Sequence, residues 1–196
     1  MRPIIIILLF LLCTSTARAE PWQFIKTKES PGAFLSGFLS GYAAHELAHI
    51  IVARAKGFDA EFDGVTLVYP EARMSDPEHL QVASSGFQMQ WLVAETALRY
   101  RHKSELSEFG DSYNAGLIAS HLAITAAYLT VLRDHEDGDL KGASEATGIS
   151  TRRLAALVAI PALLDAWRLL GDDVPAWAPA LSLGSKAAGI TWIWTY

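Results

Sequence analysis

The chain has 196 residues, of which 51% are hydrophobic and 19% are charged, and its formal net charge is −5. This length suits a single domain with a hydrophobic core. The acidic balance gives a nucleic-acid partner no electrostatic support, so we expect none. The hydrophobic fraction is high and the charged fraction is low for a soluble domain, which favours a membrane protein.

Residues 1–19 have the pattern of a secretory signal peptide. Arg2 supplies the positive charge, Ile4 to Leu12 is an unbroken apolar run, and Ala17-Arg18-Ala19 is a small-x-small cleavage site. The run is too short to span a bilayer, which takes about 20 residues. We therefore expect export to the cell envelope, with residues 20–196 forming one helical domain. An uncleaved anchor is the alternative.

The apolar run from Ala33 to Ala53 predicts a long helix, with Ser30 as its cap and Pro31 in its first turn. Residues 58–82 predict a short β-hairpin or loop insertion, because Val65 to Tyr69 is β-prone and is bounded by turn residues. Further helical segments are predicted at residues 84–98, 113–132, 154–170 and 175–196.

Several of these segments have about the length of a membrane span, and the last ends in Trp192, Trp194 and Tyr196, aromatic residues typical of a bilayer interface. The predicted fold class is a mainly α, polytopic membrane helix bundle of about 4–5 helices, with the insertion at 58–82. A soluble helical bundle is the alternative.

The motif His45-Glu46-Leu47-Ala48-His49 lies inside the first predicted helix. A spacing of four places both imidazoles on one helix face, where they can share a Zn²⁺ ion at about 2.0–2.1 Å. Zinc lowers the pKa of a bound water toward about 7, and Glu46 can accept the proton and pass it to a leaving amine. The motif therefore predicts His45 and His49 as zinc ligands and Glu46 as the catalytic base.

The residues around the motif support its interpretation as a metal-binding site. A glutamate in an apolar run is costly to bury without a partner, and metal binding would provide one. Ala33, Gly37 and Gly41 precede His45 at steps of four, which predicts the close approach of another helix. The alternative is a hydrogen-bonded polar core that holds no metal.

A catalytic zinc site takes three protein ligands, so one more must come from elsewhere in the chain. Asp137 and Asp139 follow the helix predicted at 113–132, Glu95 lies on the helix at 84–98, and His121 lies inside the helix at 113–132. Residue types and spacing leave these four candidates open.

The order of these features resembles the site-2 protease family of intramembrane zinc metallopeptidases. The zinc motif is followed by the β-prone stretch at 58–70, then by Gly86-Phe87-Gln88-Met89-Gln90, and finally by Asp137-Gly138. Glutamine stands where the family has asparagine, and Gly86 is not followed by the family's proline. The resemblance implies that Asp137 is the third zinc ligand and that Gly86, Gln88 and Gln90 bind substrate.

Motif and resemblance together predict a zinc-dependent metallopeptidase that hydrolyses peptide bonds at or within the membrane. Its expected partners are a peptide or membrane-protein substrate and membrane lipid. One alternative is a soluble exported zinc hydrolase, periplasmic or extracellular, for which Glu95 is the more natural third ligand. Another is a non-enzymatic metal-binding membrane protein.

Overall fold

A computed structural model describes residues 30–62, 67–69, 73–103 and 106–196, so the predicted signal peptide lies outside the described residues. Within these ranges the chain is mainly helical, with seven helices and one two-stranded sheet. The long helices are α3 (Pro31–Ala55), α5 (Ser85–Lys103), α6 (Glu108–Leu129), α8 (Thr151–Leu170) and α9 (Trp177–Thr195). The short elements are β1 (Glu61–Phe62), β2 (Leu67–Val68), α4 (Asp76–Ala83) and α7 (Asp139–Thr147).

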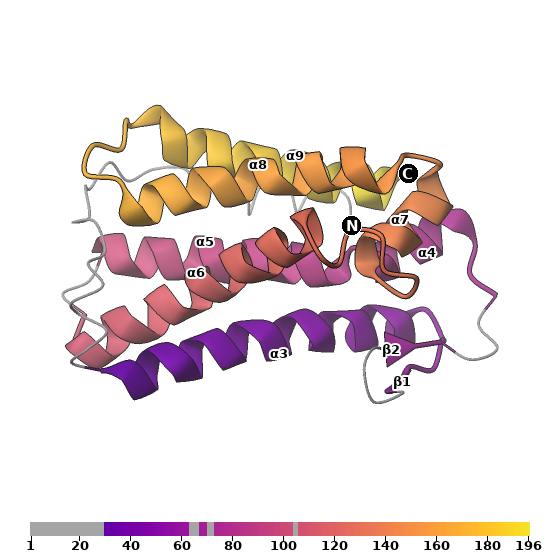
Figure 1. Cartoon of the computed structure of the whole chain (residues 1–196), viewed down its shortest axis with the longest axis horizontal. Coiled ribbons are helices and arrows are strands. Elements are labelled where there is room, and N and C mark those ends of the chain that lie inside the picture. Colours follow the sequence, from indigo (N-terminus) through magenta and orange to yellow (C-terminus); the bar gives the residue numbers. More distant parts are fainter. Residues whose placement is uncertain (1–29, 63–66, 70–72, 104–105) are drawn as a thin grey trace.

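The long helices run along one another, with α3 on one side, α5 and α6 in the middle, and α8 and α9 on the other side (Figure 1). The short elements α4, α7, β1 and β2 gather at one end of this bundle, where the C-terminus also lies. The second half of α3, which holds the zinc motif, therefore ends among the short elements.

Glycines let α3 and α6 pack closely. A Cβ atom added to Gly37 would collide with the backbone of Tyr113, and one added to Gly116 would collide with the backbone of Phe34. A Cβ atom on Gly41 would lie 2.9 Å from the hydroxyl of Ser120. The close helix approach predicted from the small-residue spacing is therefore confirmed, and α6 is the helix concerned.

The short helices have recognisable ends. At α4, the carboxylate of Glu78 accepts hydrogen bonds from the backbone N–H and the hydroxyl of Ser75, at 2.9 and 2.7 Å, as in a capping box. Helix α7 is followed by Gly148 as its C-cap, whose φ of 69° falls in the left-handed region that favours glycine. Leu140 of α7 and Leu80 of α4 share one hydrophobic core cluster, which fixes α7 beside α4.

The prediction for residues 58–82 is correct in only one part. Glu61 pairs with Val68 and Phe62 with Leu67 in an antiparallel ladder, but Asp76–Ala83 is helical. The sequence predicts no helix between residues 132 and 154, where the chain forms α7, so the described helices outnumber the predicted 4–5. Both short helices were missed because, at 8 and 9 residues, they are shorter than the stretch over which a helical period is read.

The prediction of a membrane bundle is wrong. Among the described residues, no helix is both long enough and apolar enough to cross a membrane. Polar side chains interrupt each apolar run: Glu46 in α3, His121 in α6, Arg168 in α8 and Lys186 in α9. This finding contradicts the predictions of transmembrane helices and of a membrane location, whereas the expected lipid partner stays a prediction.

Candidate metal centre

His45, His49 and Asp139 bring three donor atoms together at the end of the bundle. His45 and His49 lie on the buried face of α3, and Asp139 is the first residue of α7. The two Nε2 atoms are 3.3 Å apart. The carboxylate of Asp139 places Oδ2 3.0 Å from Nε2 of His45 and Oδ1 3.4 Å from Nε2 of His49. These residues form a candidate metal-binding triad.

The spacing of the triad fits a small divalent ion. Ligands at about 2.0–2.1 Å from a tetrahedral zinc are separated from one another by about 3.3 Å, the edge of the tetrahedron. The two imidazole Nε2 atoms are 3.3 Å apart, and each lies close to a different oxygen of the Asp139 carboxylate, at 3.0 Å for Oδ2 and 3.4 Å for Oδ1, so each separation is close to that edge. The donor set, two imidazoles and one carboxylate, is also one that zinc accepts.

The ring orientation of His49 is set by α4. Its Nδ1 lies 2.9 Å from the carbonyl oxygen of Val82. A carbonyl can only accept, so Nδ1 carries the hydrogen and, in the neutral ring, Nε2 presents its lone pair to the other donors. The hydroxyl of Ser85 also donates to Val82, at 2.7 Å. Metal-binding histidines are commonly held in this way, with the distal N–H bonded to a backbone carbonyl.

Gly86 leaves the room that the two imidazoles need. A Cβ atom at this position would lie 2.5 Å from Nε2 of His45 and 2.5 Å from Nε2 of His49. Next to it, the ring of Phe87 packs edge-on against His45 and against Tyr128, with centroid separations of 5.8 and 5.0 Å. The start of α5 thus forms one wall of the triad.

The charges within the triad support one another. Burial would raise the pKa of Asp139, but the neighbouring imidazoles hold it well below its usual range. Burial would lower the pKa of His49, but the charge and hydrogen bond of Asp139, aided by Val82 and Glu46, raise it to about 9. Without metal, Asp139 is therefore ionised at neutral pH, and the His49 ring is protonated on both nitrogens.

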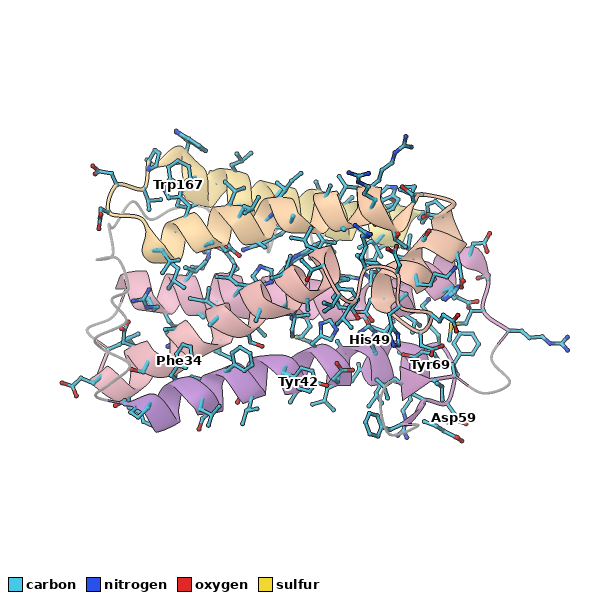
Figure 2. The ribbon with its side chains drawn as sticks, viewed as in Figure 1. Phe34, Tyr42, His49, Asp59, Tyr69 and Trp167 are labelled. Carbon is cyan, nitrogen blue, oxygen red and sulfur yellow. The ribbon has the colours of Figure 1, made fainter. Side chains whose placement is uncertain are left out.

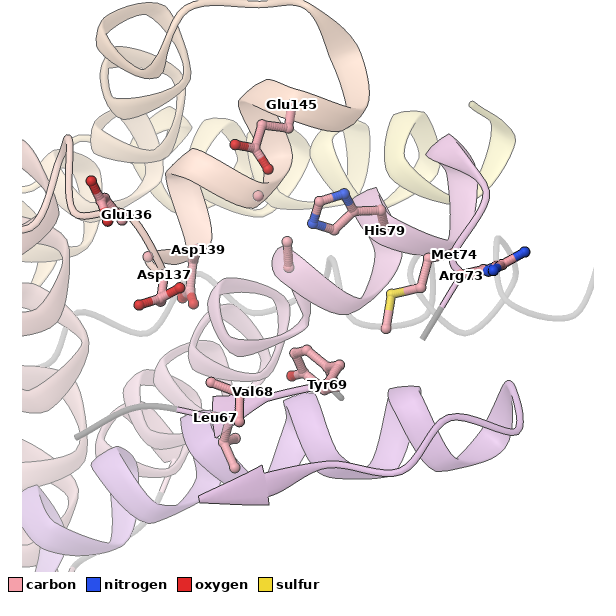
Figure 3. Close-up of a pocket in the computed structure, with 13 residues that line it drawn as sticks. Leu67, Val68, Tyr69, Arg73, Met74, His79, Glu136, Asp137, Asp139 and Glu145 are labelled. Carbon is pink, nitrogen blue, oxygen red and sulfur yellow. The ribbon is translucent and has the colours of Figure 1, made fainter. Parts of the chain in front are cut away.

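A cleft of about 420 Å³ opens beside Asp139, between β2 on one side and α4 and α7 on the other (Figure 3). Glu46 is half-buried on α3, one residue after His45. Burial raises the pKa of Tyr69 and of Tyr128, and the negative charges of Asp139 and Glu46 add to this effect. Glu46 and Asp139 thus both lie within electrostatic reach of these two tyrosines.

The other candidate ligands do not belong to the triad. Asp137 is exposed and lines the cleft, but it does not belong to the triad. Glu95 is buried, and contacts with Arg168 and Lys186 outweigh the effect of burial and lower its pKa to about 2. His121 is buried with Nε2 3.5 Å from Oδ2 of Asp165; mainly because of burial, its pKa falls to about 4.

Ion pairs that join α5, α8 and α9 explain why Glu95 is not free to bind metal. Arg168 donates to Glu95 at 2.6 Å and to Asp165 at 3.1 Å. Lys186 contacts Glu95 at 3.0 Å and Asp165 at 2.7 Å. The close spacing of Asp165 and Arg168 in the sequence indicates their ion pair. The part played by Lys186 was missed, although a single lysine in an apolar helix is a signal for it.

The residues predicted to bind substrate have other surroundings. Gly86 faces the imidazoles, as described above. Gln88 accepts a hydrogen bond from Nε1 of Trp194 at 2.7 Å and donates to Ser84 at 3.0 Å. Gln90 is 2% exposed. Neither glutamine lines the cleft beside Asp139.

Comparison with protein-family models, with curated proteins and with solved structures finds no match.

Proposed function

We propose that this chain is a zinc-dependent metallopeptidase, with His45, His49 and Asp139 as the zinc ligands and Glu46 as the general base. The close approach of two imidazole nitrogens and one carboxylate carries the proposal, because the Nε2–Nε2 distance of 3.3 Å and the Nε2–carboxylate distances of 3.0 and 3.4 Å are near the edge length of a zinc tetrahedron. Three protein ligands leave a fourth position open, which is the arrangement of catalytic rather than structural zinc.

The residues around the triad would have different roles in peptide hydrolysis. When bound, zinc would polarise a substrate carbonyl and make a water molecule more acidic. The Glu46 carboxylate accepts the proton of the attacking water and later delivers it to the leaving amine nitrogen. Val82 holds His49 in the tautomer that keeps Nε2 free, and the cleft beside Asp139 gives an extended substrate access to the site.

The activity test compares the parent protein with Glu46→Gln on a library of fluorogenic quenched peptides, both proteins being loaded with zinc. We expect hydrolysis by the parent and a loss of at least about 100-fold in the variant, the usual size of a general-base contribution. Zinc content should be equal, because Glu46 is not a ligand. Glu61→Gln, an exposed glutamate of β1 at the same end of the bundle, is the matched control.

Three outcomes are informative. Hydrolysis that survives in Glu46→Gln rules out this mechanism. Zinc binding without any hydrolysis by the parent leaves a non-enzymatic metal-binding protein. Iron in place of zinc in the purified protein points to the other chemistry that two histidines and one carboxylate support, that of non-haem iron.

A further inference from the structure

Tyr69 lies in the cleft that adjoins the metal triad. It directly follows β2 and is half-buried. In Figure 3 its ring lies at the floor of the cleft, with Asp137 and Asp139 on one side and Met74 and His79 on the other. Figure 2 shows Tyr69 and His49 at the same end of the bundle, so a substrate bound in the cleft would lie against a wall that includes both this ring and Asp139 of the triad.

Among the described residues, Tyr69 is the tyrosine that combines access to the cleft with proximity to the reacting groups. The hydroxyl of Tyr128 lies 3.4 Å from the backbone N–H of Asp139, which donates to it, and its side chain is in the core. Tyr42 also feels the charge of Glu46, but it is exposed on α3 and does not line the cleft.

The state of the Tyr69 hydroxyl suits a hydrogen-bond donor. Burial, and then the charges of Asp139 and Glu46, raise its pKa above the ordinary value, so it keeps its proton at neutral pH. Other donors of the cleft are placed differently. Arg73 is exposed, and Nε2 of His79 would lie 3.0 Å from a Cβ atom on Gly142, against the wall formed by α7.

We propose that the hydroxyl of Tyr69 donates a hydrogen bond to the carbonyl oxygen of the scissile amide as negative charge develops there. This inference rests on the proposed peptidase function. The oxygen of water bonds to the carbonyl carbon, and the π pair of the C=O bond moves onto the carbonyl oxygen. Glu46 takes a proton from this water as the bond forms. The pair on the carbonyl oxygen then re-forms the C=O bond, the C–N bond breaks, and Glu46 passes the water-derived proton to nitrogen. Tyr69 keeps its own proton throughout and stabilises the negative charge on oxygen by its hydrogen bond.

The first test is Tyr69→Phe, which keeps the ring and removes only the hydroxyl. Loss of one donor to a developing oxyanion reduces kcat by about 10²–10³-fold, and we expect that loss with little change in KM or in zinc content. Tyr100→Phe, an exposed tyrosine of α5, is the control and should keep the parent's kcat. A change in KM alone would indicate ground-state binding and overturn the inference.

The second test measures the affinity of the zinc-loaded proteins for a phosphinic peptide by calorimetry, because its tetrahedral anionic oxygen mimics the charge that develops on the carbonyl oxygen. A hydrogen bond to a charged group corresponds to about 10- to 100-fold in affinity, so Tyr69→Phe should bind the phosphinic peptide more weakly by that factor.

The binding test separates the failure of this inference from the failure of the proposed function. A parent that hydrolyses no peptide refutes the peptidase, yet the two phosphinic affinities can still be compared. Equal affinities of parent and Tyr69→Phe would overturn the role of Tyr69, as would a parent that does not bind the phosphinic peptide. Loss of zinc from Tyr69→Phe would also overturn it, because Tyr69 would then support the metal centre itself.

Discussion

Replacing Gly86 by alanine should damage the metal centre while leaving the helix intact. The new methyl carbon would lie 2.5 Å from Nε2 of each histidine, whereas unstrained contacts are about 3.5 Å or longer. The imidazoles or α5 must therefore move by about 1 Å, which is several times the tolerance of about 0.2 Å for metal–ligand distances.

Two opposing terms set the stability of this variant. Alanine in place of a helical glycine contributes about 0.5–1 kcal/mol, and overpacking costs about 1–3 kcal/mol. We expect a net loss of up to about 2 kcal/mol in the metal-free protein, with zinc affinity weakened at least about tenfold because the donors no longer match the ion.

The assay is a competition titration of zinc against a chelator, combined with urea unfolding of the metal-free protein. Gly184→Ala is the matched control, because it is also a helical glycine but has nothing within 4 Å of an added Cβ atom. This control should keep the parent's zinc affinity and become slightly more stable. If Gly86→Ala binds zinc as tightly as the parent, the imidazoles do not hold the metal in the described geometry.

Further predictions concern protons and charges. Because the pKa of His49 is raised to about 9, zinc must displace a proton, so apparent zinc affinity should rise with pH up to about 9 and then level off; a chelator competition at several pH values measures this. Arg168→Met leaves two buried carboxylates short of a partner and should cost about 3–5 kcal/mol in urea unfolding. Lys141→Ala, which breaks the exposed pair with Glu145, should cost less than about 1 kcal/mol. Since the folded-state pKa of Glu95 is depressed to about 2 from 4.5, its contribution to stability is present above about pH 4.5 and should be lost as the pH falls through about 2; unfolding free energies measured across this range check the sign.

The helix that carries the zinc motif could be predicted from patterns of neighbouring residues in the sequence. The predicted helix from Ala33 to Ala53 lies within α3, because its apolar run, its Pro31 start and its small-residue stripe all depend on residues close in the chain. The pairing of His45 with His49 follows from helix geometry in the same way.

The third donor could not be predicted from spacing, since it depends on a turn between distant elements. The resemblance implied Asp137, whereas the structure brings Asp139 to the histidines. Helix α7 begins at Asp139, after Gly138 as its N-cap, and its packing on α4 turns this carboxylate toward α3. Asp137 and Asp139 are only two residues apart, and the start of α7 decides which of the two carboxylates reaches the histidines. The sequence does not predict α7.

The amino-acid composition led to the wrong prediction of a membrane environment. A count of apolar residues does not distinguish the interior from the surface, and α3 exposes Leu35, Leu39, Leu47 and Ile51 on the face opposite its buried histidines. The charged groups of α8 and α9 that meet in the core also come from segments far apart in the sequence. Their pairing is a tertiary property that no single apolar run reveals.

The central claim is that His45, His49 and Asp139 together hold one zinc ion. Elemental analysis of the purified protein, after reconstitution with zinc and removal of excess metal, tests it most directly. The account predicts about one zinc per chain in the parent, as in a mononuclear catalytic site, loss in His45→Ala and in Asp139→Ala, and retention in Asp137→Ala. A parent that retains no metal, or an Asp139→Ala variant that retains it fully, would contradict the account.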